Sequence, residues 1–312
     1  MLLDFEVLIR QMLSFYTMIG VGFGGYCLRM VGDEDVAALS RFLVRIFIPA
    51  MLMTNIVNTV RTETLPKLPG LLFALFLTLA LMLAIGWGTG KLFGLGEDTQ
   101  GVHTAMMGLP NDGLLGYQLW LAVFPEEAGL AIMAGCIVYS IAQWGIAYPL
   151  TIPKGSETTF HWKKMLTPPL LSSAVGCAMV LADIHPEGNM VWDTLSGIGS
   201  CTKYVAMIYI GGVLAQKGIC RTFKRPVLFA TAFIKMLVIP FAIALILGVL
   251  PFLDRTYWCM VVMMSAMPAP VVVCIQAAMN RSDEEYAVGS MVLSTVICLG
   301  TIPLVMYLTA LI

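Results

Sequence analysis

The stretch Gly108-Leu109-Pro110-Asn111-Asp112-Gly113 interrupts a long run of apolar residues in the first half of this 312-residue chain. A second apolar run, in the other half, is interrupted by Met267-Pro268-Ala269-Pro270. Proline cannot donate a helical hydrogen bond, and glycine tolerates backbone angles that end a helix. Inside a bilayer, the N–H and C=O groups that such a break frees must face protein or a watery cavity. The two breaks therefore indicate discontinuous membrane helices, of the kind that form the substrate site of secondary transporters.

The composition indicates a polytopic membrane protein. Hydrophobic residues make up 59% of the chain and charged residues 12%, whereas a soluble domain carries about 25% charged residues. The formal net charge is −1 and no nucleic-acid-binding motif is present. We therefore expect a lipid bilayer, and no nucleic acid, among the partners.

Ten apolar segments of the sequence are long enough to cross a bilayer, which takes about 20 residues. The predicted spans are 7–29, 36–58, 69–93, 102–124, 128–150, 166–183, 192–216, 227–250, 256–279 and 286–310. With this count, the loops on one side hold ten lysines and arginines, and the loops on the other side hold three. The positive-inside rule then places both termini outside. We expect a multi-pass protein of the plasma (inner) membrane.

The two halves of the chain match at an offset of 158 positions, which superimposes Pro110 on Pro268 and Glu126-Glu127 on Glu284-Glu285. Five spans per half is an odd number, so the halves would have opposite orientations in the membrane, as in inverted-repeat transporters. We predict an all-α fold of two inverted five-helix repeats joined by a cytoplasmic linker. The predicted first repeat, linker and second repeat are residues 1–150, 151–164 and 165–312.

The first break carries polar side chains at membrane depth. Pro110 lies about eight residues into its span and hence on the order of 12 Å deep, near the midplane. Pro110 and Gly113 open the backbone, while Asn111 and Asp112 supply polar groups. We predict that these four residues bind substrate. The alternative is a kink whose polar side chains only satisfy the freed backbone.

The second break supplies mainly backbone and shape. Pro268, Ala269 and Pro270 offer carbonyl groups and almost no polar side chains. Gln276 follows about two turns later and supplies either an amide to the site or an interhelical hydrogen bond. We include all four residues in the predicted substrate site.

Three ionisable residues, Asp112, Lys203 and Lys235, lie in or near the predicted membrane interior. A charge at the bilayer centre costs at least ~2.5–3.5 kcal/mol, so each should have a partner or a function. The lysines could neutralise an anionic substrate, pair with Asp112, replace a coupling cation or cap freed carbonyls. Substrate contact and a structural role stay open for Lys203, and we favour the structural role for Lys235. Thr54 and Asn55 in the second span are further substrate-binding candidates, if their helix lines the cavity.

The sequence holds none of the motifs that an enzyme or an ATP-driven pump requires. The three histidines are isolated and lack metal-ligand spacing. No Ser/His/Asp set, HExxH motif or phosphate-cradling glycine-rich loop is present. We therefore expect no enzymatic activity, no metal and no cofactor, and a driving force that is an ion gradient or the substrate's own gradient.

Short motifs in the fourth span and near the C-terminus match a known pattern. Residues 111–116 read Asn-Asp-Gly-Leu-Leu-Gly, and Pro110-Asn111 gives a Pro-Asn pair. Leu293-Ser294-Thr295 is followed by Thr301-Ile302-Pro303. These motifs resemble those of the auxin efflux carrier family of membrane transporters. One departure is Gln118, which stands where the family has a proline.

The resemblance implies a ten-helix fold similar to bile-acid symporters and sodium/proton antiporters, with broken helices four and nine crossing at the substrate site. It also implies a scaffold, a moving transport domain and export of organic anions such as malate, malonate or auxin. Our leading hypothesis is an elevator-type efflux carrier that binds a carboxylate with Asn111 and the broken-helix backbone. The alternative is a sodium- or proton-coupled symporter or antiporter with Asp112 and Lys235 as coupling groups. Whether the chain forms a homodimer stays open.

Overall fold

The computed structural model describes residues 5–153, 166–186, 188–218 and 225–312, and all regular secondary structure in these ranges is helical. Within these ranges, seven helical segments are long and apolar enough to cross a membrane. They are Phe5–Cys27, Asp33–Thr59, Thr62–Leu92, Ala128–Leu150, Met190–Lys217, Val227–Gly248 and Glu284–Ala310. The prediction of an all-helical, multi-pass membrane protein is confirmed.

The other three predicted spans have a different form. The segment predicted at 166–183 is a shorter apolar helix, Pro168–Leu181. The segments predicted at 102–124 and 256–279 are each divided by a non-helical stretch. Most of the predicted linker at 151–164 lies outside the described residues.

The chain forms two compact units, and each unit combines segments from both halves of the sequence. Unit 1 contains Met1–Leu71, Gly113–Ile137 and Leu166–Lys217, and unit 2 contains Leu72–Asp112, Val138–Met165 and Gly218–Ile312. The units therefore differ from the two predicted repeats. The repeat boundaries stay a prediction.

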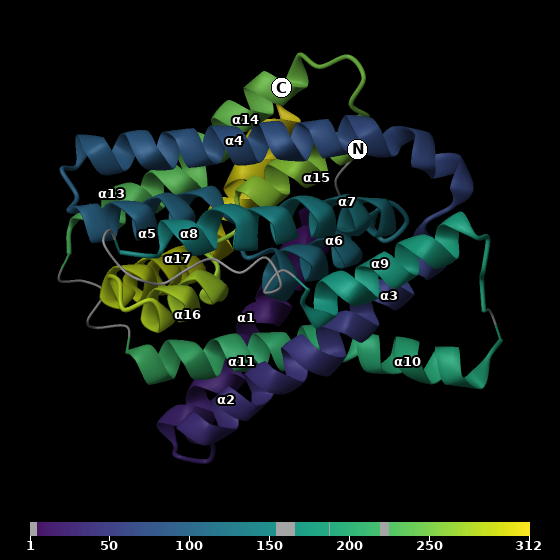
Figure 1. The fold of residues 1–312 in the computed structure, drawn as a ribbon, viewed down its shortest axis with the longest axis horizontal. Coiled ribbons are helices and arrows are strands. Elements are labelled where there is room, and N and C mark those ends of the chain that lie inside the picture. The colour runs from purple at the N-terminus through teal and green to yellow at the C-terminus, as the bar shows by residue number, and fades with distance from the viewer. Residues whose placement is uncertain (1–4, 154–165, 187, 219–224) are drawn as a thin grey trace. The chain divides into compact units, whose positions relative to one another are not determined.

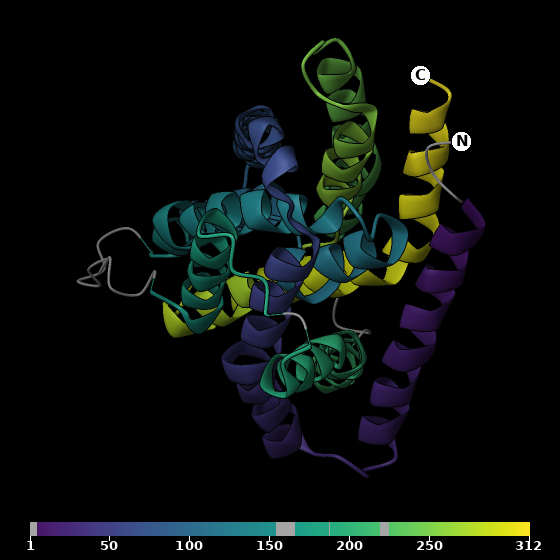
Figure 2. The ribbon, with the colours of Figure 1, turned by 90° about the vertical axis from the view of Figure 1, so that its right-hand side faces the viewer.

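Unit 1 is built around the contacts of two helices, α1 and α3. Figure 2 shows α1 as one continuous helix. The principal helices are α1 (Phe5–Cys27), α2 (Asp33–Phe42), η1 (Leu43–Phe47), α3 (Ile48–Thr59), α6 (Tyr117–Val123), α7 (Ala128–Ile141), α9 (Pro168–Leu181), α10 (Met190–Ser200) and α11 (Thr202–Lys217). The helix α1 packs on α11, and α3 packs on α9 and α10 (Figure 1). The first span of each half thus packs on the second span of the other half, which is the pattern that an inverted repeat predicts.

Glycines allow the backbones of α1 and α11 to come close. A Cβ atom added at Gly22 would overlap the carbonyl of Ile208, and one added at Gly211 would overlap the carbonyl of Ile19. Small residues at such crossings are the usual means of packing membrane helices. The pairing of α1 with α11 therefore depends on these two positions.

Unit 2 contains the parts of the chain that surround both breaks. Its principal helices are α4 (Leu68–Leu92), α5 (Glu97–Gly108), η4 (Ala142–Ala147), α8 (Tyr148–Leu150), α13 (Val227–Phe233), η6 (Ile234–Val238), α14 (Ile239–Gly248), α15 (Arg255–Ser265), α16 (Val271–Met279) and α17 (Glu284–Ala310). Its core is rich in fully buried methionines, including Met106, Met260, Met263, Met264 and Met291. Methionine side chains are flexible and fill irregular gaps, such as those beside interrupted helices.

In the part of the chain that the structure describes, three spans contain a wide π-helical turn shortly before a proline. The turns η1, η4 and η6 end two residues before Pro49, Pro149 and Pro240. Proline lacks an N–H group and its ring crowds the preceding turn, so the helix widens locally and the freed carbonyl finds another donor. These turns let the spans pass their prolines without a full break.

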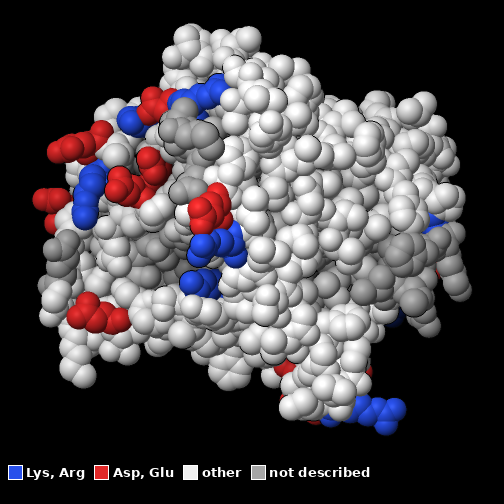
Figure 3. All heavy atoms as spheres, turned by 180° about the vertical axis from the view of Figure 1, so that it is seen from behind, with Lys and Arg blue, Asp and Glu red and all other residues white. Residues whose placement is uncertain are grey.

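Apolar side chains cover much of the outside of the molecule. Phe73, Trp87 and Phe233 are all exposed. Figure 3 shows one face on which charged side chains occupy only small areas. Such a surface matches a hydrocarbon environment.

Candidate functional site

Both predicted breaks interrupt a helix. The helix α5 ends at Gly108, residues 109–111 are not helical, and the π-turn η3 (Asp112–Gly116) follows. In the other half α15 ends at Ser265, and α16 begins at Val271 after the non-helical stretch 268–270. The prolines and glycine at these positions account for the interruptions.

The two breaks are bonded to each other. The backbone N–H of Asn111 donates to the carbonyl of Pro268 at 2.9 Å. Both residues belong to unit 2 and are buried. Each break thus supplies the partner for a backbone group that the other break leaves free, as a low-dielectric interior requires.

Lys235 caps the end of α5. Its Nζ donates to the carbonyls of Leu109 at 2.9 Å and Met107 at 3.1 Å, and only 1% of the residue is exposed. A cationic donor suits the C-terminal end of a helix, where carbonyl groups lack partners and carry partial negative charge. Of the roles considered from the sequence, the geometry supports capping of freed carbonyls.

Ser294 holds the second break in place. Its Oγ accepts a hydrogen bond from the backbone N–H of Ala269 at 3.0 Å and donates to the carbonyl of Ser290 at 2.7 Å. Sequence reasoning did not assign Ser294 to the site, although it lies in the Leu293-Ser294-Thr295 motif. The position of Ser294 in that motif was the signal that could have assigned it to the site.

Asn111 is the polar side chain most available to a ligand. The residue is 4% exposed, and within the described ranges no protein group hydrogen-bonds to its side-chain amide. Pro110 beside it is buried, and Asp112 is partly buried at the start of η3. An amide that no described protein group uses is available to hydrogen-bond a ligand.

Gln276 adds a second amide, on α16. Its Nε2 donates to the backbone carbonyl of Gln143 at 3.3 Å, which is an interhelical hydrogen bond. Its Oε1, and the Nε2 of Gln143, are buried without a hydrogen-bond partner in the described part of the chain. Gln276 therefore makes the helix contact and also keeps an acceptor free. Gln143, which sequence reasoning missed, is a lone amide in the apolar run 128–150.

The remaining candidates belong to unit 1. Thr54 Oγ1 donates to the carbonyl of Ala50 at 2.8 Å, and Asn55 Nδ2 donates to that of Met51 at 2.8 Å, so both bond their own helix. Lys203 is half-buried, with its Nζ 4.8 Å from the centre of the Tyr204 ring. Gly113 lies at the first residue of a unit 1 segment. Substrate binding by these four residues stays a prediction.

His103, one of the three histidines in the sequence, lies within α5 and not at its end. It is fully buried in α5, with Nδ1 2.7 Å from the hydroxyl of Tyr286 and Nε2 2.9 Å from Oγ1 of Thr89. It therefore links α4, α5 and α17 as a satisfied core histidine. His161 lies outside the described residues. In the ranges that the structure describes, no group of three metal-ligating side chains occurs.

A charged clamp joins the starts of α5, α13 and α17. Asp283 Oδ2 accepts from Thr99 Oγ1 at 2.7 Å and from Arg225 Nη1 at 2.8 Å, and Oδ1 caps the N–H of Tyr286 at 2.9 Å. Burial raises the pKa of Asp283, but these hydrogen bonds outweigh burial and hold the pKa below its ordinary value. The clamp fixes the helices that carry the first break and Ser294.

A polytopic helical protein whose two halves each contain a broken segment, with the breaks bonded together, has the architecture of a secondary transporter. The model of the membrane transport protein family matches the chain twice, over residues 7–161 and 154–306. The chain therefore belongs to this family, the auxin efflux carrier family, and the predicted resemblance is confirmed. The two matches also give one repeat for each half. No curated protein matches the sequence.

Proposed function

We propose that this membrane transporter is an efflux carrier for a small organic anion such as malate, malonate or an auxin-like carboxylate. The observation that carries the proposal is the Asn111 amide, which is buried beside the paired breaks and is not used by the described protein. An amide N–H that donates to a carboxylate forms a charge-assisted bond, roughly twice as strong as a neutral one.

The backbone around the second break supports anion binding as well. The helix α16 begins at Val271, directly after Pro268, Ala269 and Pro270. A helix N-terminus carries a partial positive charge and N–H groups without helical partners. Broken helices in other transporters direct such ends at anionic substrate groups. Gln276, on the same helix, would then add polar contact.

The proposed mechanism is elevator-type alternating access. We propose ten spans, with the fourth and ninth spans crossing at the bonded breaks, and with both termini outside the plasma membrane. Unit 2, which holds the break cluster, would be the moving transport domain, and unit 1 would be the scaffold. The proposed partners are the substrate anion, the lipid bilayer and a second copy of the chain.

Counterflow in proteoliposomes tests the proposal, with labelled malate, malonate and indole-3-acetate as substrates. We expect saturable uptake of at least one anion by the wild type and a large loss in Asn111→Ala. Asn58→Ala is the matched control, because the Asn58 amide bonds Trp192 and Ser196 in unit 1 instead. Equal uptake by Asn111→Ala and the wild type would overturn the site assignment.

A second candidate function is a sodium- or proton-coupled symporter or antiporter of the bile-acid symporter type. The free Oε1 of Gln276 favours it, because an amide oxygen is a suitable ligand for a hard cation. Lys235 contributes less to this function than the sequence suggested, since its Nζ is engaged by two carbonyls. Transport that persists after both ion gradients are collapsed would exclude coupling.

A further inference from the structure

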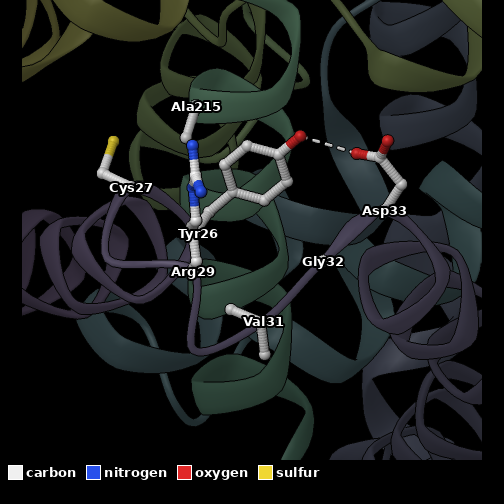
Figure 4. Close-up of a pocket in the computed structure, with 7 residues that line it drawn as sticks. All are labelled: Tyr26, Cys27, Arg29, Val31, Gly32, Asp33 and Ala215. Carbon is white, nitrogen blue, oxygen red and sulfur yellow. Dashed lines mark hydrogen bonds between the residues drawn. The ribbon is translucent and has the colours of Figure 1, made fainter.

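A cavity of about 390 Å³ lies where α1 ends and α2 begins (Figure 4). Pockets of this size accommodate small ligands and headgroups. Its lining residues all belong to unit 1 and come from α1, the α1–α2 loop, α2 and α11. They are Tyr26, Cys27, Arg29, Val31, Gly32, Asp33 and Ala215.

The cavity lies at the level of lipid headgroups. The segments Phe5–Cys27 and Asp33–Thr59 are both candidate spans, so the short loop between them must lie at a membrane–water interface. Within that loop Leu28 is 73% exposed and Met30 is 77% exposed. Exposed apolar side chains at this depth suit contact with the upper parts of acyl chains.

Two opposite charges flank the cavity. The Asp33 carboxylate is held through Oδ1, which accepts from the Tyr26 hydroxyl at 2.6 Å and from Gln216 Nε2 at 2.9 Å. No described residue hydrogen-bonds to its Oδ2 or to the Arg29 guanidinium. Figure 4 shows the Tyr26 ring between the guanidinium and the carboxylate. The Lys217 ammonium also attracts this carboxylate, so the cavity presents the Arg29 cation and a carboxylate that a second cation faces.

The backbone at Arg29 favours glycine, not arginine. Arg29 has φ = 60° and ends α1 in a Schellman arrangement, with Met30 N bonded to Gly25 O at 2.9 Å. Arg281 has the same conformation, with φ = 55°, but does not line the cavity. It therefore serves as a matched control.

We propose that this cavity binds the headgroup of phosphatidylethanolamine. The phosphate would accept hydrogen bonds from the Arg29 guanidinium, and the ammonium would donate to Asp33 Oδ2. A purely anionic headgroup such as phosphatidylglycerol would leave Asp33 facing negative charge. A phosphatidylcholine headgroup carries no N–H donor for the carboxylate. The pair of charges therefore selects a zwitterionic lipid with a primary ammonium group.

The test compares lipid-induced stabilisation of the purified, detergent-solubilised protein. We expect phosphatidylethanolamine to raise the unfolding temperature roughly twice as much as phosphatidylcholine or phosphatidylglycerol, because a ligand that binds only the folded state stabilises it. Native mass spectrometry should show that the protein retains more phosphatidylethanolamine than phosphatidylcholine or phosphatidylglycerol. Equal shifts with all three lipids would overturn the proposal.

Substitutions separate binding from folding. Arg29→Gly removes the guanidinium but introduces the residue that the backbone favours, so without lipid its unfolding temperature should equal or exceed that of the wild type. We expect it to lose the selective response, as should Asp33→Asn. Arg281→Gly and Glu34→Gln, a charge change in the same turn as Asp33, should keep the response. A response retained by Arg29→Gly, or lost in Arg281→Gly, would contradict the assignment.

Discussion

The two helix breaks are bonded together, yet they are held in place by different chemistry. At the first break, the Lys235 ammonium group caps the carbonyls of Leu109 and Met107. At the second break, the Ser294 hydroxyl holds the N–H of Ala269. The first break also presents the Asn111 amide, while the second supplies mainly backbone. The repeated halves therefore provide two similar interruptions, and side chains from other helices make them unequal.

The largest expected effect is the loss of the cap at the first break. Lys235→Met keeps the length of the side chain but leaves two buried carbonyls without donors, at about 1–3 kcal/mol each. We expect the unfolding free energy to fall by about 2–6 kcal/mol in total, measured by denaturant unfolding of the purified protein. Lys203→Met is the control, because Lys203 is half-buried and should change stability little. A fully stable Lys235→Met protein would show that capping does not stabilise the break.

The next effect concerns binding and not stability. Asn111→Ala should raise the half-saturation concentration for the transported anion about tenfold or more, because a hydrogen bond to a charged group is worth about 1.5–3 kcal/mol. Its unfolding temperature should stay unchanged, because the described protein does not use the amide. Asn111→Gln moves the amide by one methylene. Its half-saturation concentration should lie between those of the wild type and Asn111→Ala. If Asn111→Ala lowers the unfolding temperature and leaves the half-saturation concentration unaltered, the Asn111 amide supports the fold and does not bind the anion.

A smaller effect is expected at the support of the second break. Ser294→Ala leaves the buried N–H of Ala269 without an acceptor, so we expect a loss of about 1–3 kcal/mol in unfolding free energy. Transport by the remaining folded protein should keep its half-saturation concentration. Ser200→Ala serves as the control, since that exposed hydroxyl only bonds a carbonyl of its own helix. If half-saturation shifts in Ser294→Ala, the second break takes a direct part in binding.

The smallest effect tests the clamp that supports both breaks from one end. Because the pKa of Asp283 is lower in the folded protein, its stabilising contribution is present above the ordinary aspartate pKa of about 3.9. That contribution is lost as the pH falls through the lowered folded value. The unfolding temperature of the wild type should therefore approach that of Asp283→Asn as the pH is lowered below about 4. A constant difference between the two proteins over this pH range would exclude the clamp as its source.

Sequence reasoning located the breaks because proline and glycine act locally. Proline removes a helical hydrogen bond wherever it lies, and at both breaks a further glycine or proline lies within two residues, so the clusters around Pro110 and Pro268 were sufficient signals. The π-turns before Pro49, Pro149 and Pro240 follow from the same rule. The family assignment rested on short motifs in the same way.

The sequence could not predict which residues distant along the chain contact each other in the fold. Depth along a span could be estimated for Lys235, but its partners lie about 127 positions earlier in the chain. Thr54 and Asn55 looked free because local bonding to the helix backbone leaves no trace in the pattern of residues. The interleaved units also depend on long-range contacts, which a division at the chain midpoint does not reveal.

The cap on α5 makes the stability of this helix end independent of the ions dissolved around the protein. A dissolved ion that stabilised this helix end would be lost whenever its concentration fell below its dissociation constant. The amino group of Lys235 is covalently attached to η6, so dilution cannot remove it. The bonded breaks should therefore keep their arrangement in fresh water and in brine alike.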